Sequence, residues 1–168
     1  MADAAKGLAA SEAGARLALW QGDMAVASLQ MSAVFPGTGE NVADRPLGDG
    51  GHGAEVRALF GRGIGQHAFV EAQTAYRWRD DGFQDEGRLD LTAGWRPGPR
   101  FLVLLQSYST WTVHDPPIGQ RDISQHKIQA SLGVSTRRGD VHIGGYVTAA
   151  GRNAVDERAV FVAWWQRF

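Results

Sequence analysis

Polar and apolar residues alternate along most of the chain. Between residues 86 and 96, for example, Arg88, Asp90 and Thr92 alternate with Leu89 and Leu91. A period of two places the polar side chains on one face of a β-strand and the apolar side chains on the other. No helical period of useful length competes with this pattern, which therefore predicts an all-β protein.

The same pattern predicts nine strands, joined alternately by short turns and longer loops. We expect them at residues 15–21, 24–35, 53–62, 67–79, 86–96, 100–113, 124–137, 140–150 and 157–168. Most have about ten residues or more, the length that a tilted strand needs to cross a bilayer. Short turns at one rim and longer loops at the other are typical of outer-membrane barrels, whose short turns are periplasmic. The expected fold is an antiparallel up-and-down transmembrane β-barrel.

Composition removes several other classes of protein. The longest strongly apolar run, residues 101–105, is far shorter than the roughly 20 residues of a membrane-spanning helix. The chain has 17 Lys+Arg and 18 Asp+Glu, so no basic excess points to nucleic acid. It has no Cys, and no two of its five His share a face at metal-ligand spacing. We therefore expect no nucleic-acid partner, no metal and no cofactor.

The tryptophans give a further indication of a membrane protein. All six are expected near strand ends, whereas a soluble sandwich would hold several in mid-strand. Tryptophan prefers the membrane–water interface, where barrels carry aromatic girdles. Besides Trp20, the expected girdle residues are Trp78, Trp95, Trp111, Trp164 and Trp165.

The odd number of strands raises the question of closure. The alternation of loops makes the first and the last expected strand run in the same direction, towards the periplasm. A barrel that the chain enters and leaves on that side needs an even number of strands. We therefore expect residues 15–168 to be the C-terminal part of a larger, even-stranded barrel, with residues 1–14 irregular or helical. The alternative is that the Ala-rich start forms a tenth strand.

The end of the chain resembles a known targeting signal. Outer-membrane proteins finish in a strand with alternate apolar residues and a terminal Phe, which the barrel-assembly machinery recognises. The matching residues are Val160, Val162, Trp164 and Phe168, and Gln166 departs from the pattern. The resemblance implies the bacterial outer membrane as location, with that machinery and outer-membrane lipid as partners.

Several internal runs resemble a family of proteobacterial outer-membrane proteins. They are AEVRALF (54–60), the run 69–78, RLDLT (88–92), RPGPR (96–100), QSY (106–108) and AGRNA (150–154). Some members are described as XagA-like and are loosely connected with exopolysaccharide. The resemblance covers residues 15–168. Members are longer at the N-terminus and begin with a signal peptide, and the family supplies no catalytic residues.

Charged residues gather on the face expected to line the lumen. They are Glu55, Arg57, Glu71, Arg77, Arg88, Asp90, Lys127 and Arg137. A turn at residues 62–66 that keeps the faces aligned would place Arg57 opposite Glu71. Because buried charges must be paired or hydrated, these residues form either a polar pore that takes an ionic solute or a structural network that plugs a narrow barrel.

Three functions fit this architecture, and we expect the first: a channel or transport component for a small or ionic solute. The second is an anchor or assembly barrel in surface-polysaccharide export. The third is a lipid-modifying enzyme. A two-residue turn at residues 138–139 would place Ser135 opposite His142 with Asp140 near, but inside the lumen, away from lipid. We therefore do not expect an enzyme.

A soluble β-barrel of lipocalin type is the architectural competitor. Its apolar face would point inward and its polar face outward, the inverse of a membrane barrel. Hydropathy along the chain does not say which face is inside. The tryptophan positions, the C-terminal Phe and the difference between the two rims favour the membrane barrel.

Overall fold

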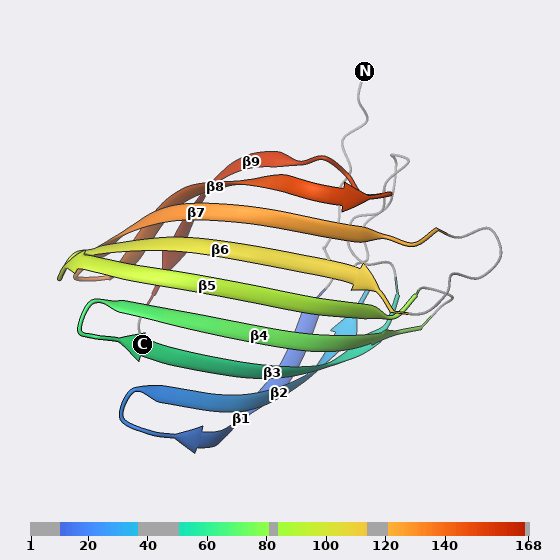
Figure 1. The fold of residues 1–168 in the computed structure, drawn as a ribbon, viewed down its shortest axis with the longest axis horizontal. Helices are drawn as coiled ribbons and strands as arrows, with labels where there is room; N and C mark the ends of the chain where they lie inside the picture. Colours follow the sequence, from blue (N-terminus) through green and yellow to red (C-terminus); the bar gives the residue numbers. More distant parts are fainter. Residues whose placement is uncertain (1–10, 37–50, 81–83, 114–120, 167–168) are drawn as a thin grey trace.

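A computed structural model describes residues 11–36, 51–80, 84–113 and 121–166. The described residues form a single antiparallel sheet, in which each strand pairs with its neighbours in sequence (Figure 1). Its strands are β1 (Ser11–Gln21), β2 (Ala25–Phe35), β3 (Gly53–Ile64), β4 (Ala68–Arg79), β5 (Glu86–Gly98), β6 (Phe101–Thr112), β7 (Ser124–Thr136), β8 (Gly139–Arg152) and β9 (Arg158–Trp165). The predicted all-β antiparallel class is confirmed. No helix in these ranges is long and apolar enough to span a bilayer.

The first strand begins earlier than expected. β1 starts at Ser11, so residues 11–14, which we expected in an irregular or helical segment, belong to the sheet. They pair with the end of β2, where Glu12 faces Val34 and Gly14 faces Ser32. The Ser32 hydroxyl also donates a hydrogen bond of 2.6 Å to the Glu12 carboxylate. The remainder of the expected segment, residues 1–10, lies outside the described residues.

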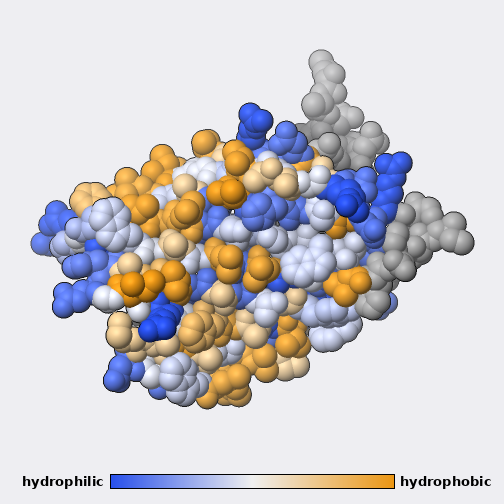
Figure 2. All heavy atoms as spheres, viewed as in Figure 1, coloured by the Kyte–Doolittle hydropathy of each residue, from blue (hydrophilic) through white to orange (hydrophobic). Residues whose placement is uncertain are grey.

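The sheet is curved, and its two faces differ in polarity. The concave face carries most of the polar side chains, including the two most buried residues, Glu55 at 2% exposure and His142 at 1%, together with a few buried apolar residues such as Leu59 and Leu104. Large apolar side chains from all nine strands are exposed, among them Leu17 at 65% and Ile143 at 59%. Figure 2 shows hydrophobic residues spread over the strands and hydrophilic residues gathered towards the ends. This is the inverse of a soluble protein, in which charged residues are almost never fully buried and large apolar patches are rare.

Two edges of the sheet are open. Among the described residues no ladder joins β1 to β9. Every residue of β1 is exposed, and on β9 Val160 is 89% exposed. An open edge presents unpaired backbone N–H and C=O groups, which are a template for pairing with another strand. The described strands therefore form an open curved sheet, and its closure into a barrel stays a prediction.

Aromatic rings cover glycines on neighbouring strands. The register pairs are Phe69 with Gly94, Trp111 with Gly87, His142 with Gly133, and Phe161 with Gly144. A Cβ atom added at Gly133 would lie 2.5 Å from Cε1 of His142, well inside van der Waals contact. At these positions the sequence needs glycine because the opposite ring occupies the space of a side chain.

Replacing Gly133 with alanine is therefore expected to destabilise the fold by about 1–3 kcal/mol, the usual cost of overpacking. The matched control is Gly61→Ala, because Gly61 also lies on the concave face and its nearest neighbour, Cγ1 of Val26, would be 3.5 Å from the new Cβ. The control should be neutral or stabilising by up to about 1 kcal/mol, since alanine reduces the freedom of the unfolded chain. Urea unfolding measures both. Equal midpoints for the two variants would contradict the steric role of the His142 ring.

Candidate functional site

One buried carboxylate holds together the centre of the concave face. Glu55 on β3 binds guanidinium groups from three strands. Arg57 Nε donates to Oε1 at 2.8 Å, Arg77 on β4 lies 2.8 Å from Oε2, and Arg88 on β5 lies 3.6 Å from Oε2. Arg77 is the register partner of Glu55 and is itself 5% exposed. A guanidinium suits such a carboxylate because its planar set of N–H groups can direct a hydrogen bond to each carboxylate oxygen.

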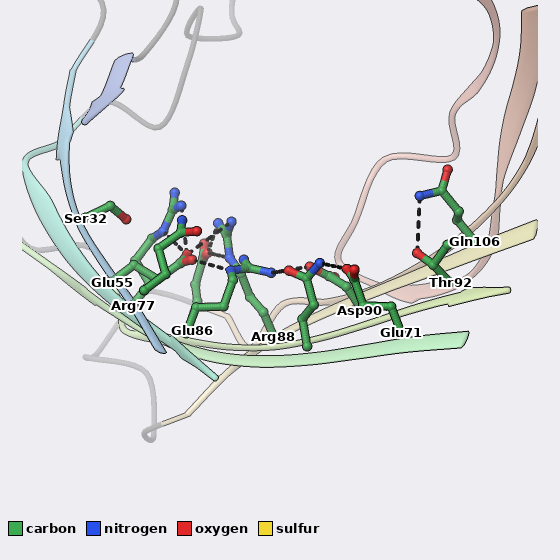
Figure 3. A network of polar contacts seen from close by, with 12 residues as sticks. Ser32, Glu55, Glu71, Arg77, Glu86, Arg88, Asp90, Thr92 and Gln106 are labelled. Atoms are coloured by element: carbon green, nitrogen blue, oxygen red, sulfur yellow. Dashed lines mark hydrogen bonds and ion pairs between the residues drawn. The ribbon is translucent and has the colours of Figure 1, made fainter. Parts of the chain in front are cut away.

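Three further carboxylates surround these arginines, and two of them, Glu86 and Asp90, are labelled in Figure 3. Glu12 on β1 is 3.0 Å from Arg77. Asp90 on β5 is 2.5 Å from Arg57. Glu86 binds two arginines, Arg79 and Arg88, each at 2.6 Å. The result is a charged network of four arginines and four carboxylates that links β1, β3, β4 and β5.

The formal charges of this charged network add to zero. Its members are Glu12, Glu55, Arg57, Arg77, Arg79, Glu86, Arg88 and Asp90. Gln73 extends it, because it accepts from Arg57 at 2.9 Å and donates a short hydrogen bond to Glu71. Buried ions need such mutual pairing, since an unpaired ion in the interior costs several kcal/mol.

Beyond β5 the concave face carries polar side chains without a comparable concentration of charge, beside the buried Leu102 and Leu104 of β6. Gln129 on β7 donates to Gln106 on β6 at 2.9 Å, and Gln106 donates to Thr92 on β5 at 3.3 Å. Lys127 lies apart from the charged network, 2.7 Å from Glu157 in the segment before β9 and 5.4 Å above the ring of Tyr146. The concave face thus has a charged half on β1–β5 and a more neutral half on β6–β8.

The structure brings together five of the eight expected lumen residues: Glu55, Arg57, Arg77, Arg88 and Asp90. Glu71 joins only through Gln73, and its register partner is Gly61, not Arg57 as expected. Lys127 makes a separate pair with Glu157.

Arg137 was expected on the lumen face and is not there. β7 ends at Thr136, and Arg137 lies exposed in the turn to β8. The expected strand was one residue too long at this end, because the turn consists of Arg137 and Arg138 rather than Arg138 and Gly139. Thr136 accordingly pairs with Gly139.

Three members of the charged network escaped the sequence analysis: Glu12, Arg79 and Glu86. Arg79 and Glu86 continue the alternation of Arg77 and Arg88 by one step each, so the period of two contained the signal. Glu12 lies in a run of small residues, Ala13-Gly14-Ala15, where the alternation of polarity is lost.

The tryptophans lie at two levels of the sheet. Trp20, Trp95 and Trp164 lie near the short turns, and Trp78 and Trp111 lie near the longer loops. Trp78 is ten residues along β4 from Ala68, the register partner of Trp95. Each of the five is at least 40% exposed.

Trp165 departs from the expected girdle. Trp164 and Trp165 are adjacent, so they face opposite sides of β9, and Trp165 stacks on His142 of the concave face with ring centroids 4.0 Å apart. Of the expected C-terminal signal, Val160, Val162 and Trp164 lie exposed on the open edge strand. Phe168 lies outside the described residues.

The Ser–His arrangement considered from the sequence does not form. His142 faces Gly133, while Ser135 faces Asp140. Neither ring nitrogen of His142 has a hydrogen-bond partner among the described residues. A different pair lies on the convex face, where the Oγ of Ser109 and the Nδ1 of His126 are 2.8 Å apart. Ser109 and His126 are register partners on β6 and β7, so a correct prediction of this register would have revealed the pair.

No group of three His, Asp or Glu side chains that could hold a metal ion occurs in the described ranges. The chain was also compared with known proteins. It matches no protein-family model, no curated protein and no solved structure.

Proposed function

We propose that the protein is a β-barrel of the bacterial outer membrane, with its convex face in lipid and its concave face lining the interior. The observation that carries this proposal is the inverted distribution of side chains. Glu55 and Arg77 are buried, whereas apolar residues of every strand are exposed. In water the exposed apolar face would drive aggregation, but in a bilayer it contacts hydrocarbon.

The spacing of the tryptophans supports the proposal. The ten residues between the levels of Trp95 and Trp78 span about 34 Å along the strand, at ~3.4 Å per residue. A strand tilt of about 35–45° reduces this to roughly 24–28 Å across the membrane, close to the ~25 Å apolar band of outer-membrane barrels. The two levels then correspond to the two interfaces, where tryptophan is favoured.

Within that architecture we propose a channel or transport component for a small or ionic solute. Its support is the series of polar side chains that crosses the concave face, from Glu12 on β1 to Tyr146 on β8, between a few buried apolar residues such as Leu59 and Leu104. The alternative is an anchor barrel that serves surface-polysaccharide export. The charged network favours this alternative, because its arginines and carboxylates neutralise one another and leave no net charge to attract a permeating ion.

Mobility on SDS gels without boiling tests the membrane barrel. Outer-membrane barrels resist SDS until heated, so the purified chain refolded in detergent should run at a different position before and after boiling. A chain that is monodisperse in plain buffer and shows no detergent-dependent shift would overturn the proposal. The band that shifts also provides a folding control for every variant below.

Conductance in planar bilayers separates the channel from the anchor. For a channel we expect ion current, and the variant Asp90→Asn should shift its reversal potential in a KCl gradient towards chloride. Asp90 is 2.5 Å from Arg57, so its neutralisation leaves the charged network with one excess positive charge. The control Asp23→Asn removes the same charge in the turn between β1 and β2, and should shift the potential less. Folded protein without current would favour the anchor.

A further inference from the structure

The convex face carries a hydrogen-bonded polar pair within its apolar surface. Ser109 on β6 and His126 on β7 are register partners, and Ser109 Oγ lies 2.8 Å from His126 Nδ1. Leu89, the partner of Ser109 on β5, is exposed on the same face. A polar side chain in contact with hydrocarbon is unfavourable unless it has a polar partner.

An apolar hollow of about 490 Å³ lies beside this pair, on the side of His126. His126 is part of its lining, and the other lining side chains on the convex face are mainly apolar, including Phe60, Val70, Leu91 and Leu105. The volume falls within the ~300–1,000 Å³ of ordinary ligand pockets. The hollow is therefore large enough for a flexible apolar chain whose polar end lies at His126.

The backbone beside His126 is irregular. The register between β7 and β8 shifts between His126, which pairs with Ala150, and Lys127, which pairs with Thr148. Ala149 is thus an extra residue on β8. Bulges of this kind change the direction of nearby side chains and are over-represented beside functional sites.

The depth of the pair suits the ester groups of a lipid. Trp111 follows Ser109 by two residues on the same face, so the pair lies about 7 Å along the strand inside the Trp111 level. If Trp111 lies among the headgroups, the pair lies at the border between the headgroups and the hydrocarbon. The acyl esters of membrane lipids are found at that border, and their chains continue into the hydrocarbon.

The chemistry of the ring matches an ester carbonyl. When the Ser109 hydroxyl donates to Nδ1, a neutral imidazole carries its proton on Nε2. That atom makes no hydrogen bond to any described residue, and it can donate to a carbonyl oxygen. A carbonyl accepts one hydrogen bond of this kind, whereas an ether oxygen at the same position is a poorer acceptor.

We propose that Ser109, His126 and the adjacent hollow form a binding site for one membrane lipid, with an acyl-ester carbonyl at His126 Nε2 and the acyl chain in the hollow. This inference rests on the proposed function, because it needs the convex face to be in the membrane. It names a specific occupant, an ester-linked diacyl lipid, for one place on that face.

The test measures lipid binding by native mass spectrometry of the refolded full chain in detergent. The probes are dimyristoyl phosphatidylcholine and its diether analogue, which has the same headgroup and chains but no carbonyl groups. Wild type should bind the ester lipid about fivefold more tightly than the ether lipid, the value of one hydrogen bond. In His126→Phe, which keeps an aromatic ring, the two lipids should bind equally.

A second pair of variants tests the hollow. Leu105→Trp fills it and should weaken binding of both lipids at least about fivefold. Val103→Trp is the matched control, because Val103 lies two residues away on the same face and outside the hollow, and it should bind as wild type does. The variants that show the heat-dependent gel shift are compared.

Two results would overturn the inference: equal binding of ester and ether lipid by wild type, or equal binding by Leu105→Trp and Val103→Trp. Either result with a normal gel shift leaves the barrel proposal standing and removes only the lipid site. Absence of any gel shift, with protein monodisperse in plain buffer, removes the barrel proposal and the lipid site together.

Discussion

Glu55→Gln is expected to destabilise the protein by about 3–5 kcal/mol, the usual cost of removing one partner from a buried ion pair. The substitution keeps the shape of the side chain but leaves three arginines around an uncharged amide. Arg57 and Arg77 donate to this carboxylate directly, and Arg88 lies 3.6 Å from it. The remaining carboxylates already bind these arginines and cannot replace the lost charge.

Urea unfolding of protein inserted in lipid vesicles, monitored by tryptophan fluorescence, measures this effect. The control is Glu157→Gln, which removes the carboxylate 2.7 Å from Lys127. That glutamate side chain is 38% exposed, and pairs so open to water contribute only about 0–1 kcal/mol. If the two variants unfold at the same urea concentration, the charged network does not stabilise the fold.

Leu91→Arg is the second large effect, and it tests the environment of the convex face. Leu91 is 44% exposed and lies midway between the two tryptophan levels, four residues from Trp95 on β5 and four from Gly87, the register partner of Trp111. At the middle of a bilayer the new arginine should cost about 2–4 kcal/mol. On a sheet surrounded by water, the same substitution at an exposed position should change stability by no more than about 0.5 kcal/mol.

The matched control for depth is Val113→Arg. Val113 is 40% exposed and follows the end of β6, beyond Trp111, where the bilayer interface is expected. Arginine costs about 0–1 kcal/mol near an interface. The difference between the two variants in vesicles therefore reports the position of the hydrocarbon. Equal stabilities would place both residues in the same solvent and contradict the membrane orientation.

Alternation of polarity predicted the strands well because it is a local property. Each strand has one apolar and one polar face, and that pattern marks its residues wherever the strand lies in the sheet. Pairing between strands is set by the turns, and there the prediction was wrong. Glycine at 139 was expected inside the turn, but with φ at 146° it is the first residue of β8.

The error in register left the faces correct. His142 faces Gly133 instead of Ser135, a displacement of two residues. Since side chains alternate with a period of two, such a displacement keeps the strand residues on their predicted faces. Of the eight charges expected on the concave face, Arg137 lies instead in a turn. Sequence missed Glu12, Arg79 and Glu86, and it could not predict which charges touch. The same limit hid the contact between Ser109 and His126.

The open edges of the sheet have a consequence for its assembly. β1 and β9 run in the same direction, because the nine described strands alternate in direction along the order of the sheet. Two copies joined around a common axis would meet with β9 of one beside β1 of the other, and each junction would be a parallel ladder with slanted hydrogen bonds. Adding copies changes the diameter of such a ring, but every junction between copies remains parallel. A ring with antiparallel neighbours throughout needs an odd number of strands added to these nine.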